Sequence, residues 1–224
     1  MTFIRLPHSF EIIQNIALYF LHEVNYKSMT TYQLEVQIAP SDIRRLKEGG
    51  YNLCIAKKVN GAYSVIWSGD QNFAPSNTFE WVDEYQVFGV DSFKVGALVK
   101  AATNSEDIQP GQSCVLDQNG VMGVATGSAH STGRFSVLNE YSAISIGVSA
   151  KLFGETRPVF VTPTSTVGTT TFEPVDDIVV WFSPMLTTGT MISGADITTS
   201  IEVKYGGGET SKSVRFSDGN WAQE

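Results

Sequence analysis

The sequence predicts an all-β protein built from two tandem, duplicated β-sandwich units of Greek-key or immunoglobulin-like type, preceded by an N-terminal helix. Three observations favour this fold class. Only 17% of the 224 residues are charged while 42% are hydrophobic, a balance typical of β-sandwiches and unlike that of disordered chains. The chain repeats itself at a spacing of 93 residues, and short apolar runs alternate with Gly, Asn and Asp turn signals.

The repeat is clearest where residues 78–87 are compared with residues 171–180. The two segments read TFEWVDEYQV and TFEPVDDIVV and agree at six of ten positions. Extended over residues 54–108 and 147–201, the same register gives 11 identities in 55 positions, and many mismatches keep their apolar character. Apolar positions persist when two copies bury the same faces, so we predict a duplicated β unit.

This register divides the chain into four segments. We expect an N-terminal helical appendage over residues 1–28, a first β unit over 29–126, a linker over 127–133 and a second β unit over 134–224. Two sandwiches in series and two halves closing together both fit this division.

Residues 9–24 carry the one long helical pattern of the chain. Its apolar seam, at three- and four-residue spacing, consists of Phe10, Ile13, Ala17, Phe20 and Val24. We expect this helix to act in assembly, packed on the β units or against another copy of the chain. Gln14 and Asn15 interrupt the apolar run, which argues against a signal peptide and favours a cytoplasmic protein.

Strands and turns follow in order. Strands are expected at residues 32–38, 51–58, 62–67, 78–90, 96–103 and 112–116, and then at 134–138, 143–151, 158–162, 171–183, 189–193, 201–205 and 211–216. Residues 41–49 predict two helical turns, capped by Ser41 or Asp42 and ended by Gly49. The dipeptides expected in tight turns are Asn60-Gly61, Asn119-Gly120 and Asp218-Gly219.

Charge and cysteine content narrow the classes of partner. Fifteen basic against 23 acidic residues leave a net charge of −8, which disfavours nucleic acid and anionic membranes as partners. Cys54 and Cys114 are the only cysteines. Their spacing around Trp67 resembles that of an immunoglobulin disulfide, but buried free thiols are the favoured interpretation.

The sequence does not predict an enzyme. Of its three histidines, His8 and His22 lie in the N-terminal appendage and His130 lies in the linker. The chain has no phosphate-binding glycine loop and no Cys or His pair at metal-ligand spacing. We therefore expect neither a catalytic centre nor a bound cofactor. The one alternative is a bound calcium ion.

That alternative concerns carboxylates that recur in both copies. The residues are Glu80, Asp83 and Glu84, matched by Glu173, Asp176 and Asp177. Three carboxylates within five residues could ligate Ca²⁺ once per copy. A solvated strand rim is the favoured interpretation, because alternation sends Glu80 and Asp83 to opposite faces unless a β-bulge intervenes.

The loop before the first acidic strand suggests a sugar site. Amide and carboxylate side chains lie between two indoles there: Trp67, Asp70, Gln71, Asn72, Asn77 and Trp81. Sugars are bound by such planar hydrogen-bonding groups together with an aromatic face. Core aromatics beside an ordinary polar loop remain the simpler explanation.

Three functions are compatible with these features. The favoured one is a non-enzymatic structural or self-assembling protein that associates with itself. The second is a cytoplasmic lectin-like protein that binds a glycan through the Trp67–Trp81 loop. The third is a membrane-active, cytolysin-like β-protein that inserts its N-terminal helix, a function that the acidic charge disfavours.

Overall fold

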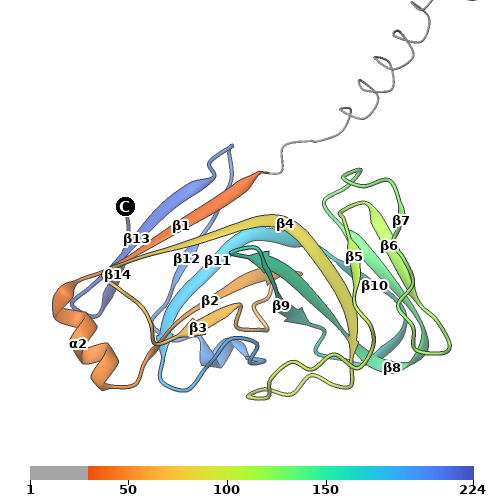
Figure 1. Ribbon diagram of the computed structural model, residues 1–224, viewed down its shortest axis with the longest axis horizontal. Helices are drawn as coiled ribbons and strands as arrows, with labels where there is room; N and C mark the ends of the chain where they lie inside the picture. The colour runs from red at the N-terminus through yellow and green to blue at the C-terminus, as the bar shows by residue number, and fades with distance from the viewer. Residues whose placement is uncertain (1–29) are drawn as a thin grey trace, which may run out of the picture. The chain divides into compact units, whose positions relative to one another are not determined.

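A computed structural model describes residues 30–224, in which Thr31–Glu224 form one compact unit. The unit is all-β and consists of two sheets (Figure 1). In chain order its elements are β1 (Thr31–Ile38), α2 (Pro40–Glu48), β2 (Asn52–Val59), β3 (Ser68–Asp70), β4 (Ser76–Val90), β5 (Glu106–Ile108), β6 (Gln112–Leu116), β7 (Thr126–Gly127), β8 (Phe135–Leu152), β9 (Glu155–Val161), β10 (Thr166–Phe172), β11 (Pro174–Ser183), the 3-10 turn η1 (Gly194–Asp196), β12 (Ile201–Val203), β13 (Ser211–Ser217) and β14 (Asn220–Gln223).

The larger sheet runs in the order β14-β13-β1-β4-β8-β6-β7, with β5, β9 and β10 paired at its sides, and the smaller sheet runs β12-β11-β2-β3. Both sheets contain strands from both halves of the chain. β1 pairs with β13 and β6 pairs with β8, both in parallel, while β4 pairs with β8 and β2 with β11 in antiparallel. The segment over residues 127–133 therefore does not separate two independently packed bodies.

Two of these pairings have matching registers. In β4 and β8, Tyr85 lies opposite Ala150; in β11 and β2, Ile178 lies opposite Lys57. At the 93-residue spacing, Tyr85 corresponds to Ile178 and Lys57 corresponds to Ala150. The pair Tyr85–Ala150 in one half therefore corresponds to the pair Ile178–Lys57 in the other. Both pairings also break register at corresponding places, between Val82 and Tyr85 and between Pro174 and Ile178.

Within residues 30–224, three segments that were expected to be strands do not form strands. Segments 62–67, 96–103 and 189–193 are connections that meet through isolated bridges, Val65 with Met191 and Leu98 with Thr190. They were expected to be strands because they are apolar. They are apolar because they cover a core cluster that includes Phe88, Val90 and Val161.

The helix predicted at residues 41–49 is α2, but its capping was predicted wrongly. Ala39 is the N-cap and makes no side-chain cap bond, and Pro40 occupies the first turn. Asp42 is buried instead, where it accepts a hydrogen bond from the backbone N–H of Asp218, 2.8 Å away, in the turn between β13 and β14. Gly49 ends the helix as expected.

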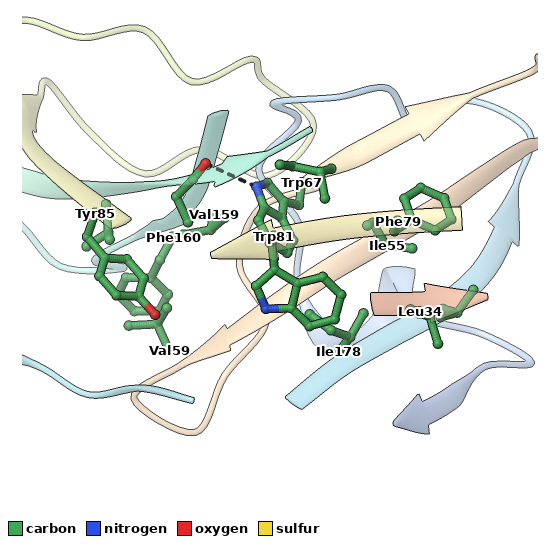
Figure 2. Packing of buried hydrophobic residues seen from close by; sticks show 14 of the residues in the cluster. Leu34, Ile55, Val59, Trp67, Phe79, Trp81, Tyr85, Val159, Phe160 and Ile178 are labelled. Carbon is green, nitrogen blue, oxygen red and sulfur yellow. Dashed lines mark hydrogen bonds between the residues drawn. The ribbon is translucent and has the colours of Figure 1, made fainter. Parts of the chain in front are cut away.

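The main core lies between the two sheets and is rich in aromatic rings (Figure 2). Trp67 and Trp81 lie at its centre with their ring centroids 5.8 Å apart in an edge-to-face arrangement. Residues from both halves surround them, among them Leu34, Ile55 and Ile178. Cys54 and Cys114 are buried free thiols, which confirms the favoured interpretation, and burial raises the pKa of Cys114 to about 11.

Candidate functional site

The polar loop between β3 and β4 lines an open pocket of about 290 Å³. We call this cavity the Phe153 pocket. It is lined by Leu53, Ser68, Asp70, Asn72, Phe73, Asn77, Thr78, Phe79, Phe153 and Arg157. Three of the six residues expected at a sugar site, Asp70, Asn72 and Asn77, are among them, and the loop faces the hairpin that joins β8 to β9.

Internal hydrogen bonds hold the loop in shape. Asp70 Oδ1 accepts from the backbone N–H of Asn72 at 2.6 Å, a short Asx-type turn. Asn77 is fully engaged: Oδ1 accepts from the N–H of Ala74, and Nδ2 donates to the carbonyls of Ala74 and Val36. Gln71 Nε2 donates to the carbonyl of Gly50 at 3.1 Å. Asn77, Gln71 and Asp70 thus shape the loop through these bonds, which in Asp70 involve Oδ1.

Trp67 and Trp81 were expected to stack on a sugar, and the structure places both in the core. Trp67 is 0% exposed and its Nε1 donates to the carbonyl of Ala150 at 3.3 Å (Figure 2). Trp81 is 2% exposed and its Nε1 lies 3.3 Å from Asp176 Oδ1. Neither indole offers a face to solvent, so the aromatic face of this site has to come from elsewhere.

Phe153 supplies that face, and the sequence reasoning missed it. The residue is half exposed, and its ring lies 5.8 Å from that of Phe79. It occupies the first position of the two-residue turn Phe153-Gly154 with φ +53°. A bulky residue rarely adopts this left-handed conformation, which costs on the order of 1 kcal/mol or more and favours Asn or Gly.

The counterpart of this turn, 93 residues earlier, contains the favoured residue. Asn60 and Gly61 have φ of +51° and +74°, against +53° and +77° for Phe153 and Gly154. The signal that could have found Phe153 was therefore present in the sequence, as a phenylalanine where the repeat has the turn dipeptide Asn-Gly.

Arg157 completes the pocket with a positive charge. Its guanidinium lies 6.0 Å from the Phe153 ring centroid, and its Nη2 is 2.7 Å from Glu155 Oε2. Asp70 adds a carboxylate on the opposite loop, so the pocket offers an aromatic face, a donor and an acceptor.

The expected acidic clusters lie elsewhere and are paired with basic residues. β4 and β11 each contain a register break, which is a β-bulge that interrupts the strict alternation of side chains. These bulges turn Asp83 and Asp176 toward the same lysine. Lys57 is fully buried, with its Nζ 2.6 Å from Asp176 Oδ1 and 3.7 Å from Asp83 Oδ1. Tyr85 donates its hydroxyl to Asp83 at 2.7 Å.

The two carboxyl groups respond differently to this environment. Burial raises the pKa of Asp83, and the nearby Asp176 adds to that rise against the attraction of Lys57. Burial also opposes ionisation of Asp176, but the charge of Lys57 and the hydrogen bonds from Lys57 and Trp81 outweigh it and lower the pKa. Asp176 is thus the principal counter-ion of the buried lysine.

The remaining carboxylates proposed as calcium ligands are separated from one another. Asp177 pairs with Lys58, Glu84 with Lys151, and Glu173 with Arg134, while Glu80 is exposed on β4. Within residues 30–224, no group of three or more His, Cys, Asp or Glu side chains is arranged to hold a metal ion.

The assembly seam of Phe10, Ile13, Ala17, Phe20 and Val24 lies outside the described residues, as does the helix on which the membrane-active hypothesis depends. Over residues 30–224, no helix has the length and apolar character needed to cross a membrane. No protein-family model, no curated protein and no solved structure matches this chain.

Proposed function

We propose that this chain is a non-enzymatic, lectin-like protein that binds a carbohydrate in the Phe153 pocket. The observation that carries the proposal is Phe153 itself. A half-exposed aromatic ring in a strained backbone conformation is costly both in hydration and in conformation. Strain of this kind is concentrated at ligand-binding sites, where the exposed group has a use that offsets its cost.

The surroundings of Phe153 suit a sugar better than an apolar ligand. One wall is formed by the rings of Phe79 and Phe153, and the other by polar groups of the β3–β4 loop. The apolar face of a pyranose packs on an aromatic ring while its hydroxyls bond to carboxylate and amide groups. Asp70, Asn72 and Arg157 provide those groups around the rim.

A glycan array probed with the full chain tests this function. Phe153→Ala removes the ring, and we expect it to reduce binding of any glycan hit at least tenfold, the usual range for a stacked aromatic anchor. Tyr141→Ala is the matched control, because Tyr141 is also about half exposed but does not line the pocket. Equal loss in both variants, or no hit at all, would refute the proposal.

We further propose that the β unit arose by internal duplication. The matching registers of β4–β8 and β11–β2, their shared bulges and the two equivalent left-handed turns all support a 93-residue repeat. The two parallel pairings, β1–β13 and β6–β8, also correspond. In this scheme the two halves close together, and both line the Phe153 pocket, the second half through Phe153 and Arg157.

Self-association is a second candidate function, favoured by a different observation. Exposed apolar side chains lie on β6, on the connection from β6 to β7, and on β8 and β10, which are neighbouring strands: Val115, Val121, Val124, Tyr141 and Val167. Such a patch on a protein surface marks an interaction site. If it joins two copies, light scattering after size exclusion will show a dimer that dissociates in a Val124→Glu, Val167→Glu variant.

A further inference from the structure

Equivalent strand edges in the two halves are covered by different residues, one by Asn60 and the other by Phe153. On the β10–β11 edge, the Asn60 carboxamide donates from Nδ2 to the carbonyl of Thr171 at 2.9 Å and accepts at Oδ1 from the N–H of Glu173 at 2.7 Å. The backbone N–H of Asn60 also donates to the Glu173 carbonyl at 3.1 Å. One side chain thus satisfies two backbone groups of an open edge.

The corresponding edge of β4 receives only the backbone bond. The N–H of Phe153 donates to the carbonyl of Glu80 at 2.9 Å, as Asn60 does to Glu173. A phenylalanine side chain has neither donor nor acceptor. Position 153 therefore leaves the Thr78 carbonyl and the Glu80 N–H without the partner that Asn60 supplies in the other half.

These two backbone groups point away from β1 and toward the Phe153 pocket. Ile38 donates to the carbonyl of Pro75, and bonded pairs alternate along an antiparallel ladder, so β1 bonds to residues 77 and 79. Thr78 and Glu80 then direct their backbone groups to the opposite side, where Phe153 meets Glu80 and where Thr78 lines the pocket.

We infer that the ligand of the Phe153 pocket is a neutral sugar that docks a free vicinal pair of hydroxyls on the β4 edge, one donating to the Thr78 carbonyl and one accepting from the Glu80 N–H. The inference rests on the proposed function and names the ligand group that it requires. The sugar ring then lies against Phe153, and its other hydroxyls reach Asp70 and Arg157.

The geometry of the Asn60 carboxamide selects this chemistry. A primary carboxamide presents an N–H and an oxygen on the same side, and so do two gauche hydroxyls on neighbouring ring carbons. A secondary amide is planar and trans, so its N–H and carbonyl point in opposite directions and cannot both reach one strand edge. The acetamido group of an N-acetylated sugar therefore does not replace the diol.

Two small amides test whether the edge is free. In ¹⁵N-resolved spectra of the full chain, millimolar acetamide is expected to shift the Glu80 amide signal, while N-methylacetamide is expected to shift it far less. Phe153→Asn should abolish the acetamide shift, because its own carboxamide fills the edge as Asn60 does. Phe153→Gly keeps the turn and leaves the edge open, so acetamide should still shift the Glu80 amide signal in this variant. A shift retained in Phe153→Asn would overturn the inference.

Methyl glycosides of glucose, galactose and mannose, each with its monodeoxy analogues, identify the ligand group. For whichever glycoside binds, removal of either docking hydroxyl is expected to weaken binding about fivefold or more, since each lost bond leaves a backbone group unpaired. Binding that Phe153→Ala abolishes but that no deoxygenation weakens would overturn this inference and leave the proposed function standing. Failure of every glycan to bind would remove both.

Discussion

Asp83 and Asp176 occupy equivalent bulges beside one buried lysine, yet their contributions to stability depend on pH in opposite directions. The folded-state pKa of Asp176 lies below its unfolded value, so its ionised form stabilises the fold above that value and the contribution is lost as the pH falls. The pKa of Asp83 is raised, so its contribution is present at low pH and disappears as the pH rises through the folded-state value.

Two amide variants test this difference. At neutral pH, Asp176→Asn leaves Lys57 buried beside a more distant carboxylate and should lower the free energy of unfolding by about 3 kcal/mol. Asp83→Asn removes a carboxylate whose ionisation is disfavoured, so the stability should stay unchanged or rise. Urea denaturation measures both, and repetition at about pH 2 should shrink the Asp176→Asn loss. Equal destabilisation by the two variants at neutral pH would contradict the assignment.

Phe153 shows at the scale of one residue why the candidate site was only partly predictable. Asp70, Asn72 and Asn77 were found because amides and carboxylates in a loop have a recognisable chemistry. Phe153 lies about 80 residues away in the chain, and only the closeness of the β8–β9 hairpin to the β3–β4 connection brings it to that loop. Trp67 and Trp81 misled the sequence reasoning because flanking a polar loop does not determine the side on which an indole lies.

At the scale of elements, α2 is held to the sheet by a polar contact as well as by its apolar face. Leu46 enters the core, while Asp42 bonds to the N–H of Asp218 and forms an ion pair with Arg45. The bond to Asp218 satisfies a backbone donor in the left-handed turn between β13 and β14. The helix therefore braces that hairpin, which stands at one end of the larger sheet.

Asp42→Ala tests this bracing. We expect it to lower the free energy of unfolding by about 1–2 kcal/mol, because a part-buried N–H loses its charged acceptor. Hydrogen exchange should speed up at Asp218 and in β14 before the rest of the sheet. Arg45→Ala is the control: Arg45 is largely exposed, so its loss should cost less than half as much. A uniform change in exchange over the whole sheet would argue against a local brace.

At the scale of the whole molecule, the two halves share their sheets. β1, β2 and β4 of the first half pair with β13, β11 and β8 of the second. A fragment of either half would lose these ladders and expose the apolar face of both sheets to water. All of these pairings lie within residues 33–216.

Two truncations follow from this arrangement. Residues 29–224 should give the far-ultraviolet spectrum of a β protein, whereas residues 29–126 alone should give that of an unfolded chain. Mixing fragments 29–126 and 127–224 is expected to restore the β signal, because the shared sheets can then form. A folded, monomeric 29–126 fragment would show that the halves are independent.

The sequence by itself determined the all-β class, most strand positions, the two-turn helix and the tight turns, because hydrophobic periodicity and turn chemistry are local properties. Only the tertiary structure decided that the strands of the two halves interleave, that two register breaks bring Asp83 and Asp176 to Lys57, and that Phe153 meets the β3–β4 loop. These outcomes depend on contacts between residues far apart in the chain, which local patterns do not encode.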